Sequence, residues 1–356
     1  MKPIRIGVIG CGYWGPNLIR NFVSLSDSEV AIVADTRPER LKHIQSLYPR
    51  IQITEDYHQI FSMDLDAAVV ATPPATHFTI AKDCLGNGLH TFVEKPMTLN
   101  SKDCRELIDL AERKHLTLMV GHTYEYNPAV RKVKEIIDTG DLGEIYYINT
   151  VRVNMGLFQS DSNVIWDLAP HDISILLYLL DRFPISVQAI GKDCIFSEKP
   201  DLAYIHLGFP GKVSAHLHLS WLDPRKVRQT TIVGSHKMLV YDDIESTEKI
   251  KIYDKGIETP PYTDTFADFH LSYRYGDVVI PYIQFTEPLR VECQHFIDCI
   301  LDGNQQPISC GNQGLQVVQI LEAAERSLCD KGQRQLLTSE EHLVTGRLSA
   351  VQIVGD

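Results

Sequence analysis

The first fifteen residues constrain the fold of this chain more than any other stretch. Residues 4–9 form a short apolar run with β-branched side chains, which is typical of a buried strand. The run leads directly into a G-x-G-x-x-G turn at Gly10, Gly12 and Gly15. Such a turn lets the backbone approach a pyrophosphate, which then lies at the positive N-terminus of the following helix.

An acidic residue completes this pattern. Asp35 follows Gly15 by twenty residues, at the end of the strand-like run 30–34, and an acid there can accept hydrogen bonds from both hydroxyls of an adenosine ribose. Tyr13 and Trp14 fill the two variable positions before Gly15, where we expect their backbone N–H groups to face phosphate. The spacing predicts a dinucleotide site, and a plain strand-to-helix turn is the alternative.

The same acid favours NAD over NADP. A carboxylate at Asp35 repels the 2′-phosphate of NADP, although Arg37 can partly accommodate that group. We therefore expect NAD as the cofactor and keep NADP as the alternative.

Length and charge narrow the class of protein. A chain of 356 residues is long for one core and suggests two domains. The formal net charge of −12 argues against nucleic acid or an anionic membrane as a partner, because both attract basic surfaces. The eight cysteines include no C-x-x-C pair, the start shows no signal peptide, and no apolar run reaches the roughly 20 residues of a membrane span. These features predict a cytoplasmic protein with reduced thiols.

Up to residue 122 the chain alternates between strand-like and helix-like segments. Strands are expected near residues 4–9, 30–34, 51–54, 67–71, 89–93 and 116–120. Helices are expected near residues 15–25, 38–48, 75–87 and 101–115. Alternation with short connections specifies a parallel sheet with helices on both faces. We therefore predict an α/β Rossmann dinucleotide-binding domain over residues 1–122.

The second part of the chain has a different pattern. Long alternating runs predict an α+β domain over residues 123–356, with a large, mostly antiparallel open sheet and helices on one side. A helix near residues 170–180 interrupts the strands, and helices near 288–301 and 314–331 follow them. The stretch 254–287 is rich in Tyr, Pro and Asp without a clear period, so we expect it to be irregular or to form an arm.

One alternating run predicts self-association. Residues 212–221 place Ser214, His216, His218 and Ser220 on one face of a strand, which is polar but uncharged. Such a face suits burial against a copy of itself, so we expect a homodimer or homotetramer built through the open face of the sheet. His216 and His218 also resemble a metal pair, but no third ligand is spaced nearby, and we predict no metal site.

Three further motifs carry a family resemblance. Glu94-Lys95-Pro96 follows the fifth expected strand, Thr72-Pro73-Pro74 follows the fourth, and Asp167-x-x-x-His171-Asp172 lies in the second part. Together with the N-terminal turn they make the chain similar to the glucose–fructose oxidoreductase / inositol dehydrogenase (Gfo/Idh/MocA) family. The resemblance implies a Rossmann domain followed by an open-sheet domain. It also implies NAD or NADP, and hydride transfer at a hydroxyl of a sugar, cyclitol or sugar nucleotide.

A finer resemblance concerns the substrate. The stretch from Asn154 to His171 is similar to that of family members acting on nucleotide sugars, such as 3-dehydrogenases of UDP-N-acetylhexosaminuronates. We therefore expect a ring hydroxyl of a nucleotide sugar, at C3, as the reacting group. An inositol or free-sugar dehydrogenase is one alternative, and a non-catalytic NAD-binding regulator is the other.

Three residues have the chemistry for catalysis. Oxidation of an alcohol needs a base for the hydroxyl proton and a donor to the developing alkoxide. We assign His171 as the base, with a helix cap as the alternative, and Lys95 as the donor, with a solvated loop lysine as the alternative. Asp167 precedes His171 by one helical turn and can orient the imidazole, whereas Asp172 is expected to be an acid in the first turn of a helix.

The remaining cofactor contacts follow from the same loops. Thr72 and Pro73 stand at the carboxyl end of a strand and are expected to shape the adenosine side of the groove. His77 either contacts the ligand or caps a helix. Glu94 either contacts the ribose of the nicotinamide half or pairs with Lys95.

Substrate contacts are expected from the second domain. Arg152 and Asn154 lie on one side of a strand, and we assign them to the substrate together with Tyr126, Lys95, Asp167 and His171. Arg225 and Arg228 are further cations for a diphosphate or carboxylate. Ordinary surface or sheet-face polarity is the alternative. The segment 121–128 is often arginine-rich in the family but carries aromatics here, so we assign it no arginine contact with the cofactor.

Overall fold

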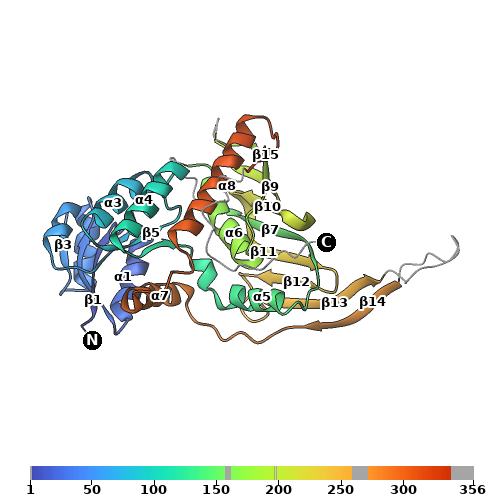
Figure 1. The fold of residues 1–356 in the computed structure, drawn as a ribbon, viewed down its shortest axis with the longest axis horizontal. Coiled ribbons are helices and arrows are strands. Elements are labelled where there is room, and N and C mark those ends of the chain that lie inside the picture. Colours follow the sequence, from blue (N-terminus) through green and yellow to red (C-terminus); the bar gives the residue numbers. More distant parts are fainter. Residues whose placement is uncertain (1, 157–161, 196, 198, 259–271, 338–356) are drawn as a thin grey trace.

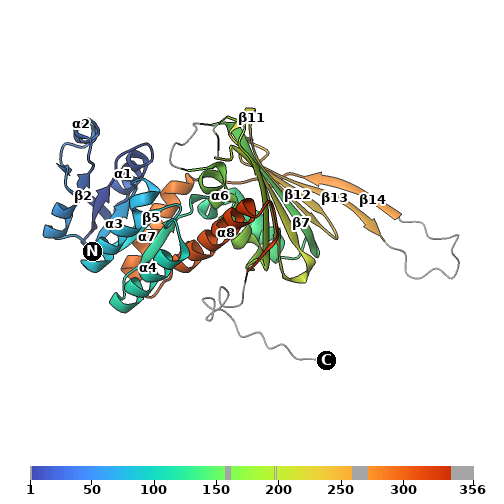
Figure 2. The same ribbon diagram turned by 90° about the horizontal axis from the view of Figure 1, so that it is seen from above.

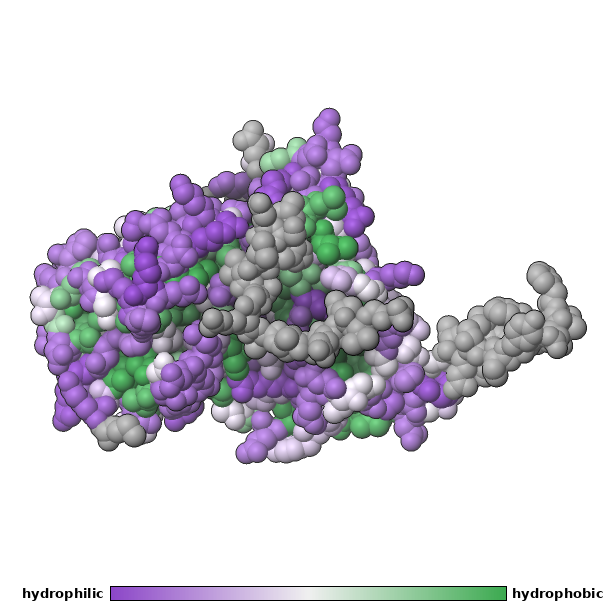
Figure 3. Space-filling view, in the orientation of Figure 1, coloured by the Kyte–Doolittle hydropathy of each residue, from purple (hydrophilic) through white to green (hydrophobic). Residues whose placement is uncertain are grey.

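The computed structural model describes residues 2–156, 162–195, 197, 199–258 and 272–337. The described chain forms two sheets, with helices between them and around the first (Figure 1). In the space-filling view of the same face, hydrophilic side chains cover most of the surface (Figure 3). None of the described helices combines the length and the apolar character that crossing a membrane requires.

The first sheet is parallel and has six strands in the order β3-β2-β1-β4-β5-β6. Its strands are β1 (Ile4–Ile9), β2 (Ser28–Ala34), β3 (Gln52–Thr54), β4 (Ala67–Val70), β5 (His90–Glu94) and β6 (Leu118–Gly121). The connecting helices are α1 (Gly15–Ser24), α2 (Pro38–Leu47), η1 (Tyr57–Ser62), α3 (Pro74–Gly86) and α4 (Ser101–Lys114). This order is that of a Rossmann fold, which confirms the predicted class, and it places the ligand crevice beyond the carboxyl ends of the strands.

The second sheet has nine strands in the order β14-β13-β12-β11-β7-β10-β9-β8-β15. β10 runs parallel to β7, whereas the other neighbouring strands are antiparallel. The strands are β7 (Ile145–Met155), β8 (Ser186–Lys192), β9 (Leu202–Gly208), β10 (Ser214–Ser220), β11 (Leu222–Gly234), β12 (Met238–Asp242), β13 (Ile250–Glu258), β14 (Ser272–Val279) and β15 (Gln335–Leu336). The mostly antiparallel sheet predicted for this part is therefore confirmed.

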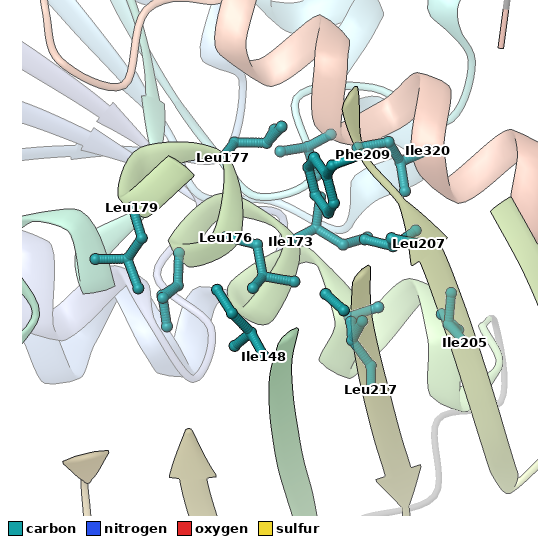
Figure 4. Close-up of a cluster of buried hydrophobic side chains, with 14 of the residues drawn as sticks. Ile148, Ile173, Leu176, Leu177, Leu179, Ile205, Leu207, Phe209, Leu217 and Ile320 are labelled. Carbon is teal, nitrogen blue, oxygen red and sulfur yellow. The ribbon is translucent and has the colours of Figure 1, made fainter. Parts of the chain in front are cut away.

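Helices cover one face of this second sheet. They are α5 (Pro128–Asp138), α6 (Val164–Leu180) and α8 (Gly311–Cys329). η2 (Thr123–Tyr126) precedes α5, α7 (Pro288–Asp302) lies against the first sheet, and the turn η3 (Pro210–Lys212) joins β9 to β10. Figure 4 shows Ile173 and Leu176 of α6 among Ile148, Leu207 and Leu217 of the strands. Seen along the sheet, no described helix lies on the opposite face (Figure 2). That face is the one predicted for self-association.

The last two helices return to the first sheet. Phe296 of α7 packs edge-on against Phe22 of α1 and Phe92 of β5, with ring centroids 6.3 and 5.8 Å apart. Leu315 and Val318 of α8 join the core on the other face of the sheet, with α3 and α4. Residues from beyond position 122 therefore complete both cores of the Rossmann unit.

Two segments of the second domain can be compared with their predictions. Helix α6 begins at Val164, before the expected start near residue 170, because Pro170 lies inside the helix without ending it. In the stretch 254–287, the arm that was one of the two predicted alternatives is formed by β13 and β14, which pair with a register shift between Tyr253 and Lys255 and extend beyond the body (Figures 1 and 2). Residues 259–271 of that stretch lie outside the described residues.

Candidate active site

The glycine turn is shaped for close approach of a ligand. Gly10 has φ of +94°, and a Cβ there would lie 2.6 Å from the carbonyl oxygen of Ala71. A Cβ on Gly15 would collide with the carbonyl oxygen of Gly10. Only glycine fits both positions, so the backbone at the start of α1 stays open for a pyrophosphate. The side chain of Tyr13 is 88% exposed and lies beside this turn.

Asp35, directly after β2, is hydrogen-bonded to the glycine turn. Its carboxylate accepts hydrogen bonds from the backbone N–H groups of Cys11 (2.8 Å) and Arg37 (2.9 Å). Arg40 Nη1 lies 3.6 Å from the same carboxylate. Each oxygen of Asp35 keeps a second lone pair for a ribose hydroxyl. Arg40 is therefore a cation beside this carboxylate, on the side where a 2′-phosphate would approach.

His77 has a different role from both predicted ones. Its ring nitrogens lie 2.8 Å from the carbonyl oxygens of Pro96 and Thr72, and its side chain is buried. The imidazole therefore joins the loops after β4 and β5 and has no ring nitrogen left for a ligand. It does not cap α3 either, because Pro73 is the N-cap residue and provides no side-chain hydrogen bond.

Lys95, Asp167 and His171 come together between the two sheets. Lys95 Nζ donates a hydrogen bond to the backbone oxygen of Asp167 (3.0 Å) and lies 3.7 Å from its carboxylate. The other carboxylate oxygen accepts from Trp221 Nε1 at 3.0 Å. The Asn163 side chain caps α6, and the helix continues through Pro170, so Asp167 and His171 lie one turn apart.

His171 is held as a neutral imidazole. Burial lowers its pKa well below the usual value, and the positive charges of Lys95, Arg152 and Arg228 add to the effect. Its ring packs edge-on against Tyr124, with centroids 5.2 Å apart, and its Nδ1 has no hydrogen-bond partner among the described residues. A neutral ring with an unpaired nitrogen can accept a proton from a bound hydroxyl.

Two neighbours of this group were left without a firm role by the sequence. His122 is 1% exposed, and neither ring nitrogen has a partner in the described part of the chain. Burial and the charge of Lys95 lower the pKa of His122 to about 3. Glu94 Oε2 accepts from the backbone N–H of Lys95 at 3.2 Å, while Oε1 is buried without a described partner. Glu94 is the last residue of β5 and His122 directly follows β6, and this position at the carboxyl end of a strand is the signal that could have found His122.

Glu94 does not hold the ammonium of Lys95. That ammonium points to Asp167 instead, so the predicted pairing of Glu94 with the Lys95 side chain is absent from the described contacts. Burial raises the pKa of Glu94 to about 7, partly offset by the nearby charge of Lys95. Glu94, His122 and His171 thus each keep a buried polar atom without a partner among the described residues.

Arg152 is engaged inside the protein. Its guanidinium makes two hydrogen bonds to Asp172, at 2.8 and 3.0 Å, and donates to the Tyr124 hydroxyl at 3.1 Å. Arg152 is buried and therefore has no direct access to a substrate. Asp172 lies in the middle of α6, so it is not the first-turn acid that the sequence predicts. The pair positions Tyr124, whose ring rests on His171.

The other residues predicted to bind the substrate differ in how accessible their side chains are. Tyr126 is fully buried, and its hydroxyl bonds to Ser309, so it cannot touch the substrate. Arg228 donates to the Tyr124 hydroxyl at 2.9 Å, and its side chain is 32% exposed. Asn154 is half-buried near the end of β7, and Arg225 is exposed on β11. Arg228 is therefore a predicted cation that contacts Tyr124 and remains partly exposed.

The histidines on the open sheet face pair across strands. His216 lies opposite His206, with their Nδ1 atoms 3.3 Å apart, and His218 stacks on Tyr204. The described residues contain no group of three His, Cys, Asp or Glu side chains arranged around a common point.

Comparison with known proteins identifies the family. Residues 4–122 match the model of an oxidoreductase family with an NAD-binding Rossmann fold, and residues 130–240 match the GFO/IDH/MocA C-terminal domain. UDP-N-acetylglucosamine 3-dehydrogenase of Acidithiobacillus ferrooxidans is 28% identical over 262 residues, which is 73% of this chain and 80% of the relative. Inositol 2-dehydrogenase of Rhizobium meliloti is 25% identical over 341 residues, or 93% and 98% of the two chains.

A solved structure agrees with this result at the level of the fold. The structure of the Acidithiobacillus ferrooxidans UDP-N-acetylglucosamine 3-dehydrogenase has a TM-score of 0.76 and 24% identity, covering 94% of this chain and 100% of that one. The two matched models together span more than half of the chain. This protein is an NAD-dependent oxidoreductase of the Gfo/Idh/MocA family.

Proposed function

We propose that this protein oxidises a ring hydroxyl, at C3, of a nucleotide-activated hexose derivative of the UDP-N-acetylhexosaminuronate type. The observation that carries the proposal is the contact of Lys95, directly after β5, with Asp167, which lies one helical turn before His171 on α6. NAD, when bound, supplies the carbon that accepts the hydride. The chain must supply a proton acceptor and a donor to the reacting oxygen.

The three side chains divide these tasks. Lys95 donates a hydrogen bond to the substrate oxygen and steadies its developing negative charge. His171 accepts the hydroxyl proton at its imidazole, which burial and the neighbouring positive charges keep neutral by lowering its pKa. Asp167 holds the Lys95 ammonium in place, and Trp221 fixes the Asp167 carboxylate in turn. The joint presence of these groups favours turnover over a purely regulatory role.

A relative and a basic side chain support a nucleotide sugar as the substrate. The relative from Acidithiobacillus ferrooxidans is a UDP-N-acetylglucosamine 3-dehydrogenase. Arg228 is a partly exposed cation on Tyr124; it lies 3.6 Å from the Asp243 carboxylate and keeps further guanidinium N–H groups for a carboxylate or phosphate of the substrate. The eight cysteines are unpaired, which suits the proposed place of action in the cytoplasm.

An inositol dehydrogenase is the second candidate. Inositol 2-dehydrogenase of Rhizobium meliloti matches nearly the whole length of this chain. A cyclitol carries no charge and would need no contact with Arg228. The substitution Arg228→Gln should therefore raise KM for a charged nucleotide sugar and leave KM for an inositol unchanged.

A substrate panel decides between the candidates. NADH fluorescence is followed with UDP-N-acetylglucosamine, its uronic acid, free hexoses and myo-inositol. The proposal expects the highest kcat/KM for a UDP-sugar, and a higher value for inositol or a free hexose would contradict it. The position of oxidation is tested with sugar nucleotides deuterated at C3 or at C4. Only the C3 label should appear in the NADH recovered.

A further inference from the structure

The short turn η2 lies between the catalytic group and the C-terminal helices. It has only four residues, Thr123 to Tyr126, and follows β6, the last strand of the first sheet. A single turn has little stability of its own, because forming it fixes several residues for few hydrogen bonds. His122, its N-cap residue, provides no side-chain hydrogen bond. The position of η2 must therefore be set by its tertiary contacts.

One residue of the turn contacts the catalytic group. The Tyr124 ring packs edge-on against the imidazole of His171, with centroids 5.2 Å apart. The Tyr124 hydroxyl accepts hydrogen bonds from Arg152 at 3.1 Å and from Arg228 at 2.9 Å. A shift of η2 would therefore move an aromatic ring relative to the proposed base.

Other residues of the turn are held by the C-terminal part of the chain. Thr123 Oγ1 donates a hydrogen bond to Glu292 Oε2 of α7, at 2.7 Å. The Tyr126 ring lies beside His295 of α7, with centroids 5.4 Å apart, and the Tyr126 hydroxyl bonds to Ser309. In the described part of the chain, the bond from Thr123 to Glu292 is the only hydrogen bond between η2 and α7.

The surroundings of Glu292 favour its uncharged form. Its side chain is fully buried. Burial raises its pKa well above the usual 4.5, and the negative charges of Glu94 and Glu125 add to the effect. An uncharged carboxyl group still accepts a hydrogen bond from the Thr123 hydroxyl. Glutamine has nearly the same shape and keeps this acceptor, so it is the conservative replacement.

We propose that Glu292 is a positioning residue for the reaction: through Thr123 it holds η2 so that Tyr124 stays against His171. Glu292 itself needs no contact with the substrate or the cofactor. It acts from a helix that lies against the first sheet, so α7 contributes to the catalytic geometry as well as to the core. The inference rests on the proposed role of His171 and on no particular substrate.

Kinetics with the best substrate of the panel test whether the effect passes through Tyr124. Glu292→Leu removes the acceptor and should lower kcat by about tenfold to a hundredfold, the cost of a small misplacement of a catalytic group. Glu292→Gln should keep kcat close to the wild-type value. On a Tyr124→Ala background, Glu292→Leu should cause no further loss, because the ring it positions is absent. Wild-type kcat in Glu292→Leu, or a further loss of the same size on that background, would overturn the proposal.

Phe296→Leu controls for lost packing on the same helix. Phe296 lies one turn after Glu292 and packs against Phe22 and Phe92, away from η2. This variant should lower the melting temperature and leave kcat unchanged. If kcat instead fell in step with the melting temperature in both variants, Glu292 would be a purely structural residue and the proposal would be wrong.

A measurement without substrate separates this inference from the proposed function. The imidazole of His171 is followed by NMR of histidine-labelled protein and assigned with His171→Asn. In Glu292→Leu, loss of the Tyr124 contact should open this imidazole to water and raise its lowered pKa towards the usual 6.5. Glu292→Gln should titrate like the wild type. An unchanged His171 titration in Glu292→Leu would refute the positioning role. A raised pKa without turnover of any sugar in the panel would support that role and contradict the proposed function.

Discussion

At the scale of single residues, Lys95 matters most for the proposed chemistry. Its ammonium reaches across from the loop after β5 to the backbone and carboxylate of Asp167 on α6. One side chain therefore links the cofactor unit to the substrate unit at the point where both ligands would meet. Removing it should affect the chemical step more than the binding of NAD.

We expect Lys95→Ala and His171→Ala each to lower kcat roughly 10²–10⁴-fold, because each removes a positioned donor or base. The dissociation constant for NAD should stay within a few-fold of the wild type, since neither residue contacts the glycine turn. Steady-state kinetics and fluorescence titration measure the two quantities, with Lys102→Ala as the control for an exposed lysine. Near-normal kcat in either variant would remove that residue from the mechanism.

Cofactor choice should depend on Asp35. The wild type should bind NAD more tightly than NADP, because the Asp35 carboxylate repels a 2′-phosphate. Asp35→Ser should narrow or reverse this preference, since Arg37 and Arg40 would remain beside the phosphate. Titration of both cofactors checks this, with Glu39→Ser as the matched exposed acid. Tighter binding of NADP by the wild type would show that the acid does not select NAD.

Glu94 should make stability depend on pH. Burial raises its pKa from 4.5 to about 7, so the folded chain binds this proton more tightly than the unfolded chain. The resulting stabilisation is complete below pH 4.5 and is lost as the pH rises through about 7. Without cofactor, the melting temperature of the wild type should therefore fall over this range relative to Glu94→Gln. If the melting temperatures of the two proteins changed with pH in the same way, the pKa of Glu94 would not be raised.

At the scale of elements, the buried ion pair that joins β7 to α6 shapes the site. Arg152 and Asp172 form a buried pair that also holds Tyr124 against His171. Removing one partner of this pair leaves the other as an uncompensated buried charge. Replacing both partners with apolar residues can leave the free energy of unfolding nearly unchanged.

We expect Arg152→Met to lower the free energy of unfolding by about 3–5 kcal/mol, as removal of one partner of a buried pair does. The double variant Arg152→Met/Asp172→Leu should recover most of this loss in urea unfolding. Its kcat should remain low, because Tyr124 loses a donor that holds it beside His171. A double variant as unstable as the single one would show that packing, not charge, sets the cost.

Elements also show what the sequence could and could not predict. The strand–turn–helix pattern at Gly10 to Gly15 and the acid at Asp35 depend on local spacing, and both lie as expected. The sequence predicts a helix start near residue 170, but α6 begins at Val164 and continues through Pro170, because the surrounding core holds it in place. The roles of Arg152 and Tyr126 could not be derived, since their partners Asp172 and Ser309 are set by tertiary packing.

At the scale of the whole molecule, the open sheet face should carry an interface. Tyr204, stacked on His218, is 52% exposed in the middle of this face. We expect the wild type to be a dimer or tetramer, and Tyr204→Glu to reduce its mass in light scattering, because a buried like-charge pair opposes stacking. Leu47→Glu on α2, at a position exposed to a similar degree, should leave the mass unchanged. A monomeric wild type would contradict the expectation.

The packing of α7 and α8 against the first sheet has a consequence for folding during synthesis on the ribosome. Phe296 and Val318 fill the two cores of the first sheet, yet they emerge after nearly all other residues have been synthesised. In the N-terminal unit, Phe22 and Phe92 therefore stay uncovered until α7 has been synthesised. A nascent chain released before α7 would expose that surface and become a substrate for chaperones, although every residue of its glycine turn is already present.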